Sequence, residues 1–157
     1  MWVSLFSFVN IAAIVAWVIL ILLPRKELLL TVVLYLGIGM LCLVYAVGLV
    51  GILTGWLDPV GPADAGVDFT TLEGVQSIFA SQGGTTVGWT HYLAFDLFVG
   101  LWIARDADQK GVGRLWQAPV LLATFIAGPV GLLVWLLARE RWRGPRTSES
   151  PLRQFRR

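Results

Sequence analysis

Charge is scarce in this chain and is confined to a few short blocks. Only 14% of the residues are Asp, Glu, Lys or Arg, whereas 57% are hydrophobic. A soluble domain usually carries about 25% charged residues, spread over its surface. The composition therefore argues against an ordinary soluble domain and indicates a membrane protein.

The chain also has few side chains that hold cofactors. It contains one cysteine, Cys42, and one histidine, His91, so a single chain can form neither a disulfide nor a bis-histidine haem site. Both lysines, Lys26 and Lys110, lie outside the apolar stretches, which argues against a retinal Schiff base. No Gly-rich phosphate loop or Cys cluster is present. We expect no cofactor, no bound metal and no nucleic-acid partner.

One acidic pair gives a weak metal signal. Asp106 and Asp108 form an Asp-x-Asp motif beside Arg105. Such a pair could bind Mg²⁺ together with a diphosphate, as in membrane prenyl-transfer enzymes. A solvated helix end is the simpler interpretation of the same residues.

Four apolar stretches have the length of about 20 residues that a transmembrane helix needs. They are Trp2 to Leu23, Leu28 to Leu57, Gly83 to Ala104 and Leu115 to Ala138. The first is predicted to be a retained helix, because it lacks the basic n-region of a secretion signal and its apolar run is longer. We predict an all-α polytopic membrane protein: a four-transmembrane-helix bundle over residues 1–138, followed by a basic C-terminal tail over residues 139–157.

The connections between these stretches differ in length and charge. Pro24 to Glu27 is short, so the first two helices are predicted to pack as an antiparallel hairpin. The connection from Asp58 to Gln82 has no Lys or Arg and is predicted to hold a surface helix, Thr70 to Ala80, with Thr70 or Thr71 as its cap. With four crossings the basic residues fall on both sides, so the positive-inside rule leaves the orientation open.

Two glycine motifs indicate close packing or a break in a helix. Gly51 and Gly55 form a GxxxG pair, which is typical of tight helix contacts and is compatible with a homodimer. Gly128-Pro129-Val130-Gly131 interrupts the fourth stretch near mid-membrane, where a proline kink frees backbone carbonyls. A structural kink and a binding role both fit this second motif.

A single carboxylate, Asp96, lies near the middle of the third stretch. An ionised aspartate there costs about 2.5–3.5 kcal/mol on insertion scales, so Asp96 is the first candidate for a functional residue. Tyr92 shares its helix face, whereas His91 is rotated by roughly 140°, so no direct His91–Asp96 bond along the helix is expected. In the structural alternative, the carboxyl is hydrogen-bonded to a neighbouring helix, with candidate partners Thr31, Tyr35, Thr124 and Asn10.

The segment from Gly88 to Ala107, with its His-x-x-x-x-Asp-Leu-Phe core from His91 to Phe98, resembles the neoxanthin-synthase-like family, known from the plant abscisic-acid-deficient-four protein. Gly128 to Leu133 resembles the fourth-helix pattern of that family, and the layout matches from about Ser4 to Leu137. The resemblance implies an integral membrane protein that takes part in converting the epoxy-carotenoid violaxanthin into the allenic neoxanthin. That conversion is an isomerisation without redox change.

The reaction that the resemblance implies needs one acid and one base near an apolar cavity, and this requirement suggests roles for the candidate residues. Asp96 is the expected acid, His91 the base or a substrate-orienting group, and Tyr92 a modulator of Asp96. The expected substrate-binding residues are Trp89, Thr90, Phe95, Trp102, Asn10 and Thr124.

The expected partners are a carotenoid or other isoprenoid lipid and the bilayer itself. The chain shows no plastid transit peptide, so we expect a multi-pass protein of a bacterial inner membrane or an equivalent pigment-containing membrane. Its substrate then need not be violaxanthin. The alternative function is a non-catalytic carotenoid- or lipid-binding membrane protein.

Overall fold

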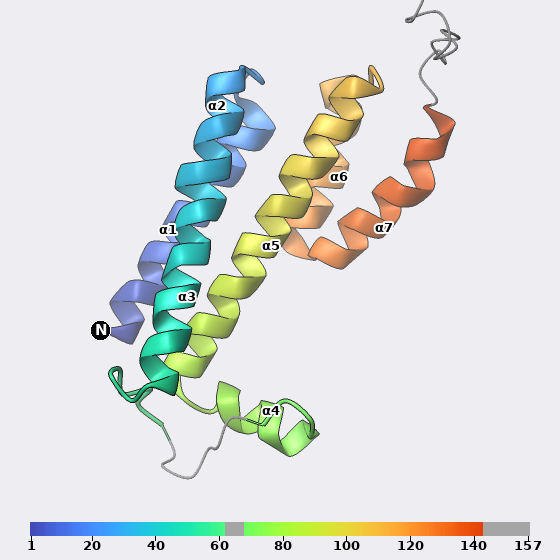
Figure 1. Ribbon diagram of the computed structural model, residues 1–157. Coiled ribbons are helices and arrows are strands. Elements are labelled where there is room, and N and C mark those ends of the chain that lie inside the picture. The colour runs from blue at the N-terminus through green and yellow to red at the C-terminus, as the bar shows by residue number, and fades with distance from the viewer. Residues whose placement is uncertain (62–67, 143–157) are drawn as a thin grey trace, which may run out of the picture.

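The structure, a computed structural model, describes residues 1–61 and 68–142, which form helices and no strand (Figure 1). Three helical segments are long and apolar enough to cross a membrane. The first is α1 (Trp2–Leu22), and the third is α5 (Gln82–Gln109). The second is continuous from Glu27 to Leu53 and comprises α2 (Glu27–Val32), the π-helix η1 (Val33–Gly39) and α3 (Met40–Leu53). The predicted all-α class is confirmed, and the three spans support a polytopic membrane protein.

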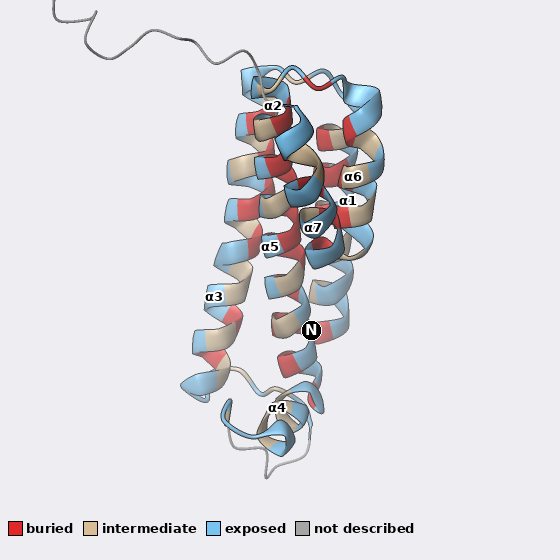
Figure 2. Cartoon of the chain, turned by 90° about the vertical axis from the view of Figure 1, so that its right-hand side faces the viewer, coloured by how far each residue is buried: buried red, intermediate tan, exposed pale blue. Residues whose placement is uncertain are grey.

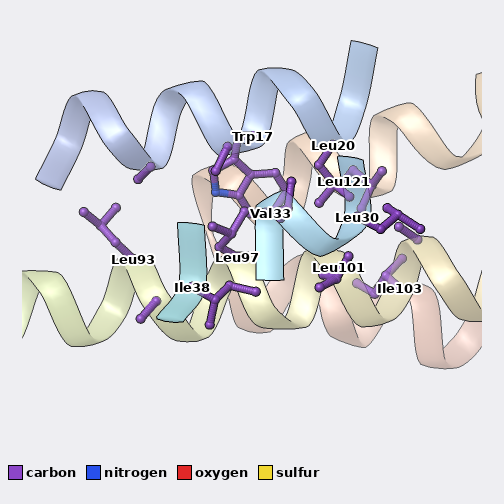
Figure 3. Packing of buried hydrophobic residues seen from close by; sticks show 14 of the residues in the cluster. Trp17, Leu20, Leu30, Val33, Ile38, Leu93, Leu97, Leu101, Ile103 and Leu121 are labelled. Atoms are coloured by element: carbon purple, nitrogen blue, oxygen red, sulfur yellow. The ribbon is translucent and has the colours of Figure 1, made fainter. Parts of the chain in front are cut away.

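Helix α5 is the centre of the bundle. Half of its most apolar window is buried inside the protein, compared with 28% for each of the other two spans. Trp17 of α1 packs directly on Gly100 of α5, where a Cβ atom would overlap the indole ring. Figure 3 shows Trp17 beside Leu97 and Val33 in the apolar core. Buried residues lie on the inward helix faces, and the outward faces expose large apolar side chains to the bilayer (Figure 2).

The predicted fourth transmembrane helix, Leu115 to Ala138, is wrong. The structure has two short helices there, α6 (Arg114–Ile126) with 13 residues and α7 (Gly128–Ala138) with 11. At 1.5 Å per residue they are about 20 Å and about 17 Å long, whereas the hydrocarbon core is about 30 Å thick. Ala127 between them has φ −152° and ψ 84°, so the chain reverses direction instead of kinking.

Polar contacts place both ends of this pair at one end of the bundle. At the start of α6, Arg114 donates to the carbonyl oxygen of Leu23 at 2.6 Å. After α7, Arg139 forms an ion pair with Asp106 at 2.9 Å. Since Leu23 and Asp106 lie at the same end of the spans, α6 and α7 form a re-entrant hairpin that enters and leaves on one side (Figure 1). We call α6 and α7 the re-entrant hairpin.

This topology lets the positive-inside rule predict an orientation, which four crossings did not allow. All Lys and Arg residues of the described chain lie at the end where the hairpin begins, which we call the basic end: Arg25, Lys26, Arg105, Lys110, Arg114, Arg139 and Arg141. The other end carries α4 (Leu72–Phe79), and the sequence from Thr54 to Ser81 contains no Lys or Arg. The positive-inside rule therefore predicts that the basic end faces the cytoplasm or its equivalent.

A buried polar cluster fastens the hairpin at the basic end. The Arg25 guanidinium, only 8% exposed, donates to the Ala104 carbonyl at 2.8 Å, to Asp108 at 2.9 Å and to Gln117 Oε1 at 2.5 Å. The Gln117 amide donates in turn to Asp108 at 2.9 Å and to the Val112 carbonyl at 2.7 Å. This cluster joins the first connection, the end of α5 and the start of α6.

The remaining connections correct or confirm details of the sequence analysis. The second span ends at Leu53, not Leu57, and Gly55 follows in a left-handed turn with φ 72°. The Gly51 to Gly55 pair is therefore no helix-dimer motif: Gly51 packs against Leu57 of its own chain. Helix α4 is confirmed, with Thr71 as its cap. Beyond η2 (Arg139–Arg141), the predicted tail lies outside the described residues from position 143.

Cysteine labelling tests the re-entrant topology. In a Cys42→Ser background, we expect Gln109→Cys and Arg141→Cys to react with an impermeant maleimide from the same side of sealed vesicles. Gln76→Cys on α4 should react from the opposite side only. Labelling of Arg141→Cys from the same side as Gln76→Cys would indicate a fourth span and contradict the hairpin.

Arg25→Met tests the polar cluster. Removing the cation takes one hydrogen-bond partner from Asp108 and one from Gln117, and breaking a buried ion pair costs about 3–5 kcal/mol. We expect a loss near 3 kcal/mol, the low end, because Asp108 is 39% exposed. Reversible unfolding in mixed micelles measures it, with exposed Lys26→Met as the matched control. Equal stability of the two variants would contradict this role.

Candidate functional site

The tip of the re-entrant hairpin exposes backbone groups within the membrane. Helix α6 ends at Ile126 and α7 begins at Gly128, with Pro129 at the next position. The first N–H groups and the last C=O groups of a helix have no partner within it. Pro129 has no N–H, and the next two N–H groups donate to the Ala127 carbonyl, so the Gly128 N–H is the donor of this first turn that is left for a partner outside the helix. The partial positive charge of a helix N-terminus favours an acidic group at this place.

Asp96 faces this donor. It lies at the middle of α5, is 7% exposed, and packs so closely on Gly128 that a Cβ atom there would overlap the carboxyl oxygen Oδ1. The Gly128 backbone N–H and the Tyr92 hydroxyl both face the carboxyl. The other oxygen, Oδ2, is buried and has no hydrogen bond of regular geometry from the described residues. The Oδ2 atom of Asp96 is therefore a buried hydrogen-bond acceptor whose capacity is unused by the described residues.

Tyr92 connects the carboxyl to the broken helix. Its hydroxyl also lies 3.5 Å from the carbonyl oxygen of Ile126, the last residue of α6. The sequence analysis predicted that Tyr92 and Asp96 share a helix face, and the structure confirms it. Tyr92 thus contacts both the carboxyl and an exposed carbonyl at the hairpin tip.

An aromatic wall leads from Asp96 toward the end opposite the basic end. The Trp89 ring stacks on Tyr92 with centroids 5.3 Å apart, and its Nε1 donates to Asn10 Oδ1 of α1 at 3.0 Å. Phe6 lies 6.2 Å from the Trp89 ring and also lines a cavity of about 300 Å³ beside Thr85 and Ser81. Asn10 and Trp89, both expected to bind substrate, therefore meet on the Asp96 side of α5.

Two other expected binding residues are satisfied inside their own helices. The Thr90 hydroxyl donates to the Thr86 carbonyl at 2.7 Å, and the Thr124 hydroxyl donates to the Val120 carbonyl at 2.8 Å. Both side chains are fully buried. Thr124 lies where a Cβ atom on Gly131 would overlap it, so it forms the close contact between α6 and α7.

His91 and Phe95 lie on the other side of α5. Their rings are 4.5 Å apart, and the His91 ring is 5.3 Å from that of Tyr45 on α3. The structure therefore does not bring His91 to the carboxyl of Asp96, which faces α7. The absence of a direct bond along the helix agrees with the predicted rotation of His91.

The residues at the basic end are occupied by structural contacts. Asp106 accepts from Trp135 Nε1 at 2.9 Å and pairs with Arg139, whose guanidinium lies 5.3 Å from the Trp102 ring. Asp108 is bonded to Arg25 and Gln117. Within residues 1–61 and 68–142, no cluster of three or more His, Cys, Asp or Glu residues has metal-site geometry. Asp106 and Asp108 thus hold the hairpin, and Trp102 lies with them.

Sequence reasoning missed the partner of Asp96. The analysis proposed side chains of neighbouring helices, whereas the structure places a backbone N–H there. The signal was present in Gly128-Pro129, because this pair combines a residue without a side chain and a residue without an N–H. It indicated a kink, however, and only the reversal at Ala127 brings Gly128 to α5.

The fold and the site define a polytopic helical membrane protein with a carboxyl at the tip of a re-entrant hairpin. A family model described as ABA DEFICIENT 4-like matches residues 4–135, which include Asp96 and the hairpin tip. The chain belongs to the ABA DEFICIENT 4-like family, and the resemblance seen in the sequence is confirmed. Membership suggests a carotenoid- or xanthophyll-related membrane protein. No curated protein and no solved structure matches the chain.

Gly128→Ala tests the close approach of the hairpin tip to Asp96. The added methyl group overlaps the carboxyl, and overpacking of this kind costs about 1–3 kcal/mol. We expect a loss in this range in the free energy of unfolding in mixed micelles. Gly113→Ala is the matched control, since its Cβ has its nearest neighbour at 4.0 Å. A Gly128→Ala protein as stable as this control would show that the tip does not touch Asp96.

Proposed function

We propose that this protein is a carotenoid isomerase of the membrane, with Asp96 as its acid and base. The observation that carries the proposal is the buried Asp96 carboxyl, which has a free Oδ2 beside a broken helix. Intramembrane ionisable residues usually mark functional sites, because their burial is costly. Family membership supports the choice of an oxygenated carotenoid as the proposed substrate class.

The proposed reaction opens an epoxide ring next to a polyene. Neutral Asp96 donates its proton to the epoxide oxygen while one ring C–O bond breaks, which yields a hydroxyl group. The neighbouring polyene carbon then loses a proton to the Asp96 carboxylate, and the electron pair of that C–H bond forms the new double bond of the allene. Atoms and protons balance, so one carboxyl suffices and no redox partner is needed.

The contacts of Asp96 suit both of its protonation states. The Gly128 N–H at the start of α7 and the Tyr92 hydroxyl stabilise the carboxylate that forms after proton donation. The same two groups fix the direction of the carboxyl, which leaves Oδ2 for the substrate oxygen. His91 has no place in this cycle, since it lies across α5.

The aromatic wall suits an elongated apolar substrate. Phe6, Trp89 and Tyr92 follow one another from the end opposite the basic end to Asp96. The hairpin covers the other half of this side of α5, because it enters from the basic end and turns at Ala127. A carotenoid end ring therefore approaches Asp96 along this wall.

Asp96→Asn is the direct test, made in cells that produce violaxanthin. With the unaltered chain we expect a new carotenoid of unchanged mass by chromatography and mass spectrometry. The amide keeps the shape but cannot donate the proton, so conversion should fall at least about a hundredfold, the low end for acid–base catalysis. Glu73→Gln on α4 is the matched control and should convert normally.

The possible outcomes separate the two functions. Undiminished conversion by a folded Asp96→Asn protein would contradict the assignment of Asp96. Pigment that co-purifies with the unaltered chain without any conversion would instead favour the non-catalytic carotenoid-binding protein. That alternative is supported by an apolar groove on the side of α5 away from Asp96, which is lined by Tyr35, Cys42, Phe95 and Phe98 among others.

A further inference from the structure

A second hollow lies on the side of α5 that faces away from Asp96. It has a volume of about 500 Å³ and lies between α5 and the segment formed by η1 and α3. Its walls are almost wholly apolar and include Tyr35, Cys42, Phe95 and Phe98. This size lies within the usual range of ligand pockets, about 300–1,000 Å³. We call this hollow the η1 groove.

The backbone beside the η1 groove has an uncommon conformation. Residues Val33–Gly39 form a π-helix, and several of them line the groove. π-Helical turns are rare and frequently occur at functional sites. Gly39 has no side chain, and a Cβ atom there would have its nearest neighbour, the Leu34 carbonyl oxygen, at 3.5 Å. The wide turn and the missing side chain both keep the groove open.

Two polar side chains, His91 and Tyr45, lie next to the η1 groove without lining it. His91 stacks on Phe95, which lines the groove, and contacts the Tyr45 ring. His91 lies about 14 Å along α5 from its first residue, at 1.5 Å per residue, and therefore within the hydrocarbon region. Within the described chain, neither the His91 ring nitrogens nor the Tyr45 hydroxyl has a hydrogen-bond partner.

Unpaired polar groups in hydrocarbon need a partner. A neutral imidazole carries one donor and one acceptor, and leaving them unbonded in an apolar medium costs several kcal/mol. Lipid chains provide no hydrogen-bonding atom at this depth. An apolar molecule that ends in an oxygen atom could pack against the walls of the groove and form hydrogen bonds with His91 and Tyr45.

We propose that the η1 groove is a second binding site for an oxygenated isoprenoid, whose hydroxyl or epoxide oxygen bonds to His91 and Tyr45. The choice of an isoprenoid as the ligand rests on the proposed function, whereas the need for a terminal oxygen rests on the unpaired polar groups of His91 and Tyr45. The site is separate from Asp96, because α5 lies between them. It holds pigment and performs no chemistry.

Retention of pigment by the purified full chain tests this site. The probes are zeaxanthin, which has hydroxyl groups on its end rings, and β-carotene, the same polyene without oxygen. In nanodiscs we expect the unaltered chain to retain zeaxanthin about tenfold better, as one added hydrogen bond implies. His91→Leu should abolish this preference, and Gly39→Leu should block retention of both pigments in the groove. Leu36→Phe, which is exposed on the same π-helix, is the control.

Cys42 locates the pigment directly. It is exposed, lines the groove and is the only cysteine of the chain. We expect bound zeaxanthin to slow alkylation of Cys42 by N-ethylmaleimide several-fold in the unaltered chain and not in Gly39→Leu. The reaction is followed by intact-protein mass spectrometry.

Several results would overturn the second site. The first is a rate of Cys42 alkylation that does not change at saturating zeaxanthin. The second is a His91→Leu variant that still prefers zeaxanthin to β-carotene. The third is the formation of Cys42 cross-links between two chains in the absence of bound pigment. Loss of conversion in His91→Leu with normal retention would make His91 a catalytic residue instead and would also overturn it. The Asp96→Asn experiment measures conversion alone, so failure of the proposed function is recognised separately.

Discussion

The central constraint on this fold is that backbone broken inside a bilayer must find its hydrogen-bond partners without bulk water. Irregular backbone occurs at membrane depth only where protein buries it or where it lines a cavity. At the hairpin tip, the Gly128 N–H faces the Asp96 carboxyl, and the Tyr92 hydroxyl lies 3.5 Å from the Ile126 carbonyl oxygen. A buried carboxyl and a broken helix are each unfavourable inside the bilayer, and the contact between them therefore stabilises both. Neither feature is understandable alone.

The rest of the molecule holds this contact in place. Trp17 fits against Gly100 and fixes α1 on α5 close to the level of Asp96. At the basic end, Arg25 and Arg139 fasten the start of α6 and the end of α7 to the end of α5. The hairpin is thus anchored at both ends, and its tip can meet α5 without a helix that crosses the bilayer. This arrangement also gathers the basic residues on one side, which makes the topology consistent with the positive-inside rule.

The all-α fold class was predictable from the sequence because the length of the apolar stretches is enough to indicate it. The three helical segments that are long and apolar enough to span a membrane, the α4 helix with its Thr71 cap, and the shared face of Tyr92 and Asp96 all follow from local patterns. The hairpin did not follow, since residues 115–138 have the length and hydropathy of a span. The deciding feature is the extended conformation of Ala127, which depends on contacts with α5 and with the basic end. The rotation of His91 away from Asp96 was predictable from helix geometry, whereas its contact with Tyr45 of α3 depends on how the helices pack.

Solid-state NMR in lipid bilayers can detect the contact between Asp96 and Gly128. The sample carries ¹³C in the side-chain carboxyl of aspartate and ¹⁵N in glycine, and dipolar recoupling detects pairs within a few ångströms. If the Asp96 carboxyl packs on Gly128, the spectrum contains a ¹³C–¹⁵N contact that disappears in Asp96→Asn and persists in Asp108→Asn. A spectrum in which Asp96→Asn removes no contact would contradict this packing, because the helix break would then have to be satisfied elsewhere.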